Sequence, residues 1–255
     1  MSTTGLLTKY VITAALRDKL FIGYIVLIAI ALSLSIFLGS SAITEKDQFA
    51  MVFAASGLRI TGVLTLTLFI VFYLRRAFET RDVEYMLSRP VTRFQFLLSH
   101  ALAFSFLATV IFLATSLAIF FLSHNYFQAG QVMWAISFWV ELMIVAMVAL
   151  FFAIYLSSAV ISTLVIFAFY VLARLIGDIL GIIEKAGETL PFFVLEKIML
   201  VVSIFVPRLD IMGQTSWLIY GVEGEVGFPF LFLQGAIFSG LIFGAAYIDL
   251  NRRQF

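Results

Sequence analysis

Long runs of apolar residues, separated by short polar stretches, dominate the pattern along the chain. A membrane-spanning helix needs about 20 mainly apolar residues, and these runs are continuous rather than alternating as in the strands of a membrane β-barrel. The pattern therefore predicts an all-α polytopic membrane protein, with residues 1–255 forming a single transmembrane domain. Its six expected transmembrane helices are 20–39, 58–74, 96–122, 132–153, 159–182 and 230–248.

Two further stretches are expected to lie at the membrane without crossing it. Residues 1–19 predict an interfacial helix, because one helical face gathers Leu7, Tyr10, Val11 and Ala14. A seventh apolar run, 190–206, is interrupted by Glu196 and Lys197. The cost of placing two ionisable groups inside a bilayer favours a re-entrant or interfacial segment over a seventh crossing. This run belongs to the expected extracytoplasmic region 183–229.

The composition supports this class and excludes several others. Apolar residues make up 63% of the chain, charged residues 12%, and the mean hydropathy is +1.11. A soluble domain is about 45–50% apolar, so disorder and a small secreted scaffold are excluded. The net charge of +1 gives no basic field for nucleic acid. The absence of cysteine removes disulfides, thiolate catalysis and cysteine metal sites.

Lysine and arginine gather on one side of the six-helix topology. That side holds both termini and the loop 75–95, and it carries ten of the sixteen basic residues: Lys9, Arg17, Lys19, Arg75, Arg76, Arg81, Arg89, Arg93, Arg252 and Arg253. Arg59 is assigned to the opposite side, where acidic residues dilute the positive charge. Because positive charge concentrates in cytoplasmic loops, both termini are predicted to be cytoplasmic, in the inner (cytoplasmic) membrane of the cell.

Motifs that would support an enzyme active site are absent. None of the lysines follows a glycine, so the chain has no Gly-Lys-Ser/Thr of a P-loop. The two histidines, His100 and His124, fall at opposite ends of one expected span and are interpreted as ordinary interfacial residues rather than metal ligands. We therefore expect no catalytic residue, no metal and no cofactor in this chain.

The loop 75–95 is the most informative polar stretch. Arg75 and Glu79 are spaced i, i+4, and Arg81 and Glu84 i, i+3, as in a helix that continues into water. Pro90 disfavours helix at the residue before it and is expected to begin the next helix. The loop also holds a short apolar cluster, which favours a docking surface over a solvated turn: Val83, Tyr85, Met86 and Leu87.

The stretch from Glu79 to Arg93 resembles the cytoplasmic motif of ABC-2 type transporter permeases. Residues 81–93 read Arg-Asp-Val-Glu-Tyr-Met-Leu-Ser-Arg-Pro-Val-Thr-Arg. At the corresponding positions the family usually has Gly-Thr-Leu-Glu-Leu-Leu-Leu-Ser-Arg-Pro-Val-Ser-Arg. The interfacial helix, the six spans, the polar turn at Ser157 and Ser158 and the re-entrant segment are similar as well. The nearest type is the permease of nitrous-oxide-reductase maturation and gliding motility. Arg81 stands where the family has glycine.

The resemblance implies a transporter subunit, an exporter, that pairs with a second permease copy, either identical or a paralogue. Each copy would receive a separate ATPase subunit, and ATP and Mg²⁺ would be bound there. It assigns the coupling to Glu79, Arg81, Val83, Glu84, Tyr85, Met86, Leu87, Arg89 and Pro90. Two alternatives stay open: a stand-alone secondary transporter or channel, and a membrane scaffold or mechanotransmission subunit.

Charged residues inside the spans are the remaining functional candidates. Arg174 and Asp178 are four residues apart, so they can neutralise each other within one helix. Glu141 has no partner on its own helix. It is expected either near the outer interface or facing Arg174 or a translocation path. These three residues form either a structural charge network or a contact for the substrate.

Overall fold

The computed structural model describes residues 3–17, 19–41, 45–80, 91–123, 129–185, 197–198, 206–222 and 227–252. Within these ranges the chain is helical and contains no strand. The helices are α1 (Thr3–Arg17), α2 (Lys19–Ser41), α3 (Lys46–Glu79), α5 (Arg93–Leu122), α6 (Ala129–Tyr155), α7 (Ala159–Lys185), α9 (Leu209–Met212), α10 (Trp217–Tyr220) and α11 (Phe228–Arg252).

Six of these helices are long and apolar enough to cross a membrane: α2, α3, α5, α6, α7 and α11. They confirm the six runs in the sequence, and five of them begin and end within four residues of the predicted bounds. The exception is α3, which begins at Lys46, twelve residues before the predicted start. Its 34 residues span about 51 Å at 1.5 Å per residue, against a hydrocarbon core of about 30 Å.

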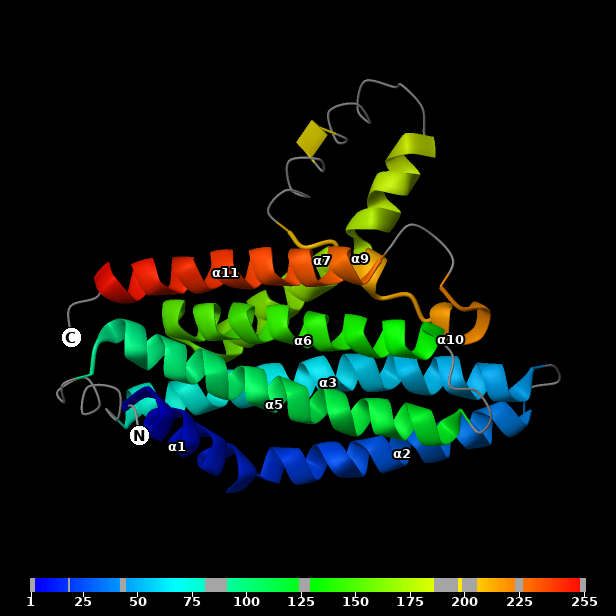
Figure 1. Cartoon of the computed structure of the whole chain (residues 1–255), viewed down its shortest axis with the longest axis horizontal. Coiled ribbons are helices and arrows are strands. Elements are labelled where there is room, and N and C mark those ends of the chain that lie inside the picture. The colour runs from blue at the N-terminus through cyan, green and yellow to red at the C-terminus, as the bar shows by residue number, and fades with distance from the viewer. Residues whose placement is uncertain are drawn as a thin grey trace.

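The long helices form one bundle in which α6 has the most helical neighbours. It contacts α3, α5, α7 and α11 as well as the short helices α9 and α10. Both described ends of the chain lie at one end of the bundle, where α3 also ends and α5 begins (Figure 1). The second half of α7 leaves the bundle and projects away from the other long helices (Figure 1). An even number of crossings explains why both described ends of the chain lie at the same end of the bundle.

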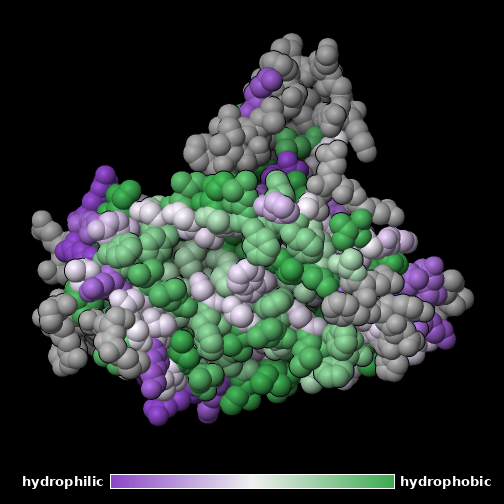
Figure 2. All heavy atoms as spheres, viewed as in Figure 1, coloured by the Kyte–Doolittle hydropathy of each residue, from purple (hydrophilic) through white to green (hydrophobic). Residues whose placement is uncertain are grey.

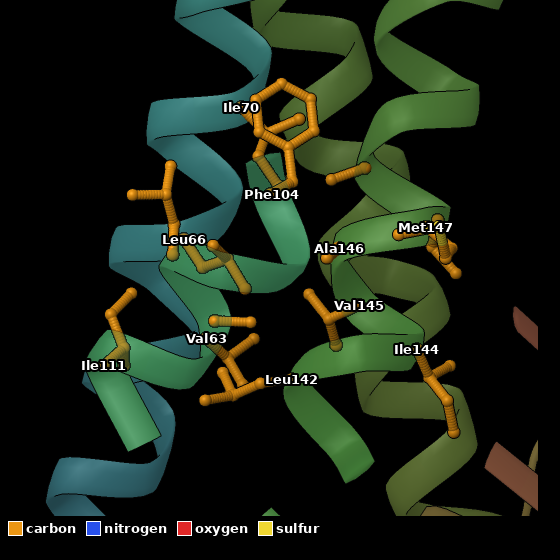
Figure 3. Packing of buried hydrophobic residues seen from close by; sticks show 14 of the residues in the cluster. Val63, Leu66, Ile70, Phe104, Ile111, Leu142, Ile144, Val145, Ala146 and Met147 are labelled. Atoms are coloured by element: carbon orange, nitrogen blue, oxygen red, sulfur yellow. The ribbon is translucent and has the colours of Figure 1, made fainter. Parts of the chain in front are cut away.

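The core lies between α3, α5 and α6. Figure 3 shows Val63, Leu66 and Ile70 of α3 in the same cluster as side chains of α5 and α6, including Phe104 and Leu142. In an 18-residue apolar stretch of each span, 67% of the residues are buried in α6 and 61% in α3, but only 11% in α2 and 17% in α11. The first two are therefore inner helices, and the last two turn most of their apolar side chains outward.

The outer surface is apolar across the middle of the bundle. Figure 2 shows hydrophobic side chains over the middle of the visible face and hydrophilic ones gathered at its two ends. Exposed large apolar residues include Ile25, Leu113 and Leu241. Contiguous apolar surface on this scale marks contact with lipid or another protein. The chain is a multi-pass membrane protein.

The amino-terminal helix α1 packs along the first turns of α5. The Thr8 hydroxyl lies 3.3 Å from the Ser99 carbonyl, to which it donates, and Val11 and Ala15 are buried. Tyr10 is 55% exposed, whereas α5 covers the face that carries Thr8, Val11 and Ala15. A position in the membrane interface stays a prediction.

The run 190–206 lies almost entirely outside the described residues, so the re-entrant segment also stays a prediction. Because the chain has no cysteine, single cysteines can test it. Cysteines at Thr80 and Gln254 should react with a membrane-impermeant thiol reagent only from the cytoplasm. Cysteines at Asp47, Glu188 and Glu223 should react only from outside. Labelling of position 254 from outside would mean that the run 190–206 is a seventh span.

Candidate functional site

The predicted coupling residues 81–90 lie outside the described residues, but both flanking helices are described. As predicted, α3 continues through Glu79, which is exposed, and ends where the backbone N–H of Thr80 bonds the Arg76 carbonyl at 2.9 Å. The coupling residues without a described position are Arg81, Val83, Glu84, Tyr85, Met86, Leu87, Arg89 and Pro90.

The start of α5 corrects one expectation about this loop. Pro90 does not begin the helix, because the next two residues are not helical and α5 starts at Arg93. Thr92 and Gln95 form a capping box: the Thr92 hydroxyl accepts from the Gln95 backbone N–H at 3.2 Å, and the Gln95 amide oxygen accepts from the Thr92 N–H at 3.1 Å. Such reciprocal bonds fix where a helix begins.

Arg93 then ties this helix start to the far end of the chain. Its Nη1 donates to the carbonyls of Leu250, at 2.9 Å, and Asn251, at 2.8 Å. These are carbonyls of the last turn of α11, and a basic side chain there satisfies them and suits the helix dipole. The segment 81–90 is thus held between two fixed points, the end of α3 and a joint of α5 with α11.

A second candidate site lies inside the bundle, around the buried carboxylate of Glu141 on α6. Arg59 of α3 places its Nε 2.7 Å from Glu141 Oε2. The Tyr170 hydroxyl of α7 donates to Oε1 at 2.7 Å, and Nη1 of Arg174 lies 3.8 Å from the same oxygen. Glu141 therefore faces Arg174, as one of the sequence-based alternatives proposed. The buried charge network, defined as Arg59, Glu141, Tyr170 and Arg174, joins α3, α6 and α7.

Arg59 is the member that sequence reasoning did not single out, since it was counted with the outer side at the start of the expected span 58–74. It lies well inside α3, and its side chain has essentially no exposed surface. Its Nη2 donates to the Ser137 hydroxyl at 2.7 Å. The guanidinium also lies over the rings of Trp134, at 5.2 Å, and Phe138, at 5.5 Å. Cation–π contacts are stronger when the cation is desolvated. The helix α6 therefore provides both the negative charge of Glu141 and two aromatic rings that stabilise the Arg59 guanidinium.

The expected pairing of Arg174 with Asp178 is wrong. Asp178 is exposed and forms no ion pair with any residue in the described ranges, whereas Arg174 turns toward Glu141. A buried carboxylate loses its hydration and needs a cation, while an exposed one does not. The buried partner therefore takes the arginine, although Asp178 is closer in sequence.

The segment around α9 covers the polar side of α7 next to this network. A Cβ added at Gly213 would overlap the Arg174 guanidinium, and one added at Gly177 would overlap the Asp210 carboxylate. Arg208 and Asp210 form a two-point ion pair, with Nε–Oδ1 at 3.0 Å and Nη2–Oδ2 at 2.8 Å. Hydrogen bonding to Asp210 raises the pKa of Arg208 above its ordinary value. Gly177 thus lets Asp210 pack tightly against α7, and Gly213 lets Arg174 of α7 pack tightly against the end of α9.

The described charges of the network sum to +1, from two arginines and one glutamate. The side chain of Arg174 remains 26% exposed, so the excess positive charge lies at the edge of the network rather than at its centre. Within the described ranges, no three His, Asp or Glu side chains are grouped so as to hold a metal ion. The network's chemistry is therefore electrostatic: it can hold three helices in register and attract an anion.

His100, interpreted as interfacial from the sequence, has its side chain buried in the helix bundle. Its Nδ1 lies 2.9 Å from the Phe96 carbonyl, and its ring lies 4.3 Å from the Phe96 ring, centroid to centroid. Tyr73 and Phe104 complete an aromatic cluster around it. His124 lies outside the described residues. A lone histidine one turn from a predicted span boundary gives no signal that separates a core position from an interfacial one.

No family model matches the chain, and no curated protein is significantly similar to it.

Proposed function

We propose that this chain is the membrane subunit of an ATP-binding-cassette exporter, with residues 79–93 as the element that receives a separate ATPase subunit. The observation that carries the proposal is the motif itself, placed between two helices that end together at one end of a six-span bundle. The missing P-loop agrees with an energy source in another subunit. ATP and Mg²⁺ would bind to that ATPase, and a second permease copy, identical or a paralogue, would complete the transporter in the inner membrane with both termini cytoplasmic.

The buried charge network gives a route by which motion at the segment would reach the rest of the bundle. The helix α3 is continuous from Lys46 to Glu79, so a shift of its end is carried along the helix to Arg59. There the ion pair with Glu141 and the bond from Tyr170 to Glu141 engage α6 and α7. We interpret the network as the link between the coupling segment and the spans that would line a path.

The continuity of the spans favours this proposal over a stand-alone secondary transporter. Secondary transporters often bind substrate at helices that are broken near the middle of the membrane. In the described ranges, each of the six spans is an unbroken helix. Alternating access would then come from tilting whole helices under the force of a partner.

The purified chain alone is expected to show neither ATP hydrolysis nor saturable ATP binding, and to support hydrolysis only when it is reconstituted with a separate ATPase subunit. The reason is the absence of any Gly-Lys-Ser/Thr sequence. Phosphate release and nucleotide binding should be measured in proteoliposomes with and without the ATPase. Saturable binding of ATP by the chain alone would contradict the proposal.

A further inference from the structure

A lateral groove of about 430 Å³ runs between α5 and α11, with α6 as its floor. Its volume falls within the roughly 300–1,000 Å³ of ligand pockets. Nearly all its lining residues are apolar or glycine, and the exceptions are Ser105 and Ser239. Trp139, Met143 and Met147 of α6 form part of the floor. A groove of this composition on a membrane-spanning bundle excludes a polar ligand.

The groove exists because α11 carries small residues on the side that faces α5 and α6. At Gly235, an added Cβ would lie 2.5 Å from the Val140 side chain, so the two helices touch closely there. At Gly240, which also lines the groove, an added Cβ would meet nothing within 4 Å. The helices therefore meet at one glycine and leave open space at the other.

One end of the groove points toward a basic end of the bundle. Phe94 of α5 contacts the rings of Phe243, at 6.0 Å, and Tyr247, at 5.6 Å, and so bridges α5 and α11 just beyond the groove. Further along lie Arg93 and the exposed Arg252, with Asp249 as the acidic residue of the same turn. Two arginines against one aspartate leave this end positive.

The spacing along α11 matches one leaflet of a bilayer. Phe243 lies nine residues and Ser239 thirteen residues before Arg252, which is about 14 Å and 20 Å along a helix. Half of a hydrocarbon core of about 30 Å is about 15 Å. An acyl chain whose headgroup lies at Arg252 therefore reaches the groove near the middle of the membrane.

We propose that this groove holds one acyl chain of an anionic phospholipid, whose phosphate lies at Arg252 and beside Arg93. The charge at the basic end selects the headgroup, because basic residues at the membrane surface attract anionic lipids. The apolar groove and its two methionines, which adapt to irregular shapes, accept the chain. The bundle would then bind anionic lipid specifically at this site, whether or not an ATPase partner is present.

Tryptophan fluorescence gives a direct test, because Trp139 lines the groove while Trp134 and Trp217 are buried. The full chain would be reconstituted in phosphatidylcholine vesicles containing rising fractions of dibrominated phosphatidylglycerol or dibrominated phosphatidylcholine. Bromine on the acyl chain quenches a nearby tryptophan. The Trp139→Phe variant identifies the part of the signal that comes from Trp139.

We expect brominated phosphatidylglycerol to quench Trp139 with an apparent affinity about fivefold higher than that of brominated phosphatidylcholine. One net basic charge contributes about 1 kcal/mol, which corresponds to this ratio. Gly240→Leu should fill the groove and abolish this preference. Gly244→Leu is the matched control, because it also meets open space on α11 but does not line the groove. Arg252→Gln should weaken the preference while quenching by brominated phosphatidylcholine stays unchanged.

Equal quenching of the unaltered chain by the two brominated lipids would overturn the proposal without recourse to any variant. Quenching of Gly240→Leu with the same anionic preference as Gly244→Leu would also overturn it, because the lipid would then lie outside the groove. Helical circular dichroism of both variants confirms that each is folded before the fluorescence is compared.

Discussion

Replacing Glu141 by alanine is expected to lower the free energy of unfolding by about 3–5 kcal/mol, the usual cost of removing one partner of a buried ion pair. The substitution would leave Arg59 without its counter-charge in a site with no access to water. Tyr170 would lose its acceptor as well. The measurement is equilibrium unfolding in mixed detergent micelles, followed by the helical circular dichroism signal.

Two further variants separate a charge effect from a general packing effect. Asp178→Ala removes a carboxylate that is exposed, so its unfolding curve should lie close to that of the unaltered chain. The double variant Arg59→Met with Glu141→Leu removes both buried charges and should be less destabilised than Glu141→Ala, because apolar replacement of a whole buried pair is often neutral or stabilising. Equal destabilisation by Glu141→Ala and Asp178→Ala would show that the network contributes no stability.

If residues 79–93 receive an ATPase subunit as proposed, truncation of the apolar cluster in this segment should have the largest effect on assembly of the complex. Binding energy concentrates in a few buried aromatic or large apolar residues, whose truncation costs about 2 kcal/mol or more. Tyr85→Ala and Leu87→Ala are therefore expected to weaken the complex more than tenfold, about 1.4 kcal/mol per factor of ten. Co-purification of the ATPase with each variant, at a series of protein concentrations, gives the measurement.

Asp82→Ala is the matched control in the same segment, because a charge at the rim of an interface contributes little. Thermal unfolding of this chain alone should be unchanged in all three variants. If the ATPase co-purifies with Tyr85→Ala and Leu87→Ala at unaltered levels, the segment is not the coupling element. If the isolated chain unfolds instead, these side chains belong to its own fold.

The spans could be predicted because each is a local property of about 20 consecutive residues. The start of α3 could not, because Ser56, Gly57 and Arg59 interrupt the apolar residues that continue back to Phe49. The burial of Arg59 depends on Glu141, Trp134 and Phe138, which lie on another helix.

The charge network shows the same limit for pairing. Spacing along one helix favoured an ion pair between Arg174 and Asp178. In the structure Arg174 lies next to Glu141 instead, because Glu141 is buried, and burial is decided only by the tertiary fold. The chain order also could not reveal that Arg93 bonds the last turn of α11, since that contact joins residues more than 150 positions apart.

The burial of Arg59 also bears on how the chain is made. Glu141 lies 82 positions after Arg59 in the sequence. At about 5–20 residues per second of synthesis, the arginine waits about 4–16 seconds for its counter-charge. An unpaired arginine near the centre of a helix costs about 2.5–3.5 kcal/mol during membrane insertion. We therefore expect the first half of α3 to remain at the insertion machinery until α6 emerges. Insertion of α3 into the membrane would be complete only when α6 has supplied Glu141.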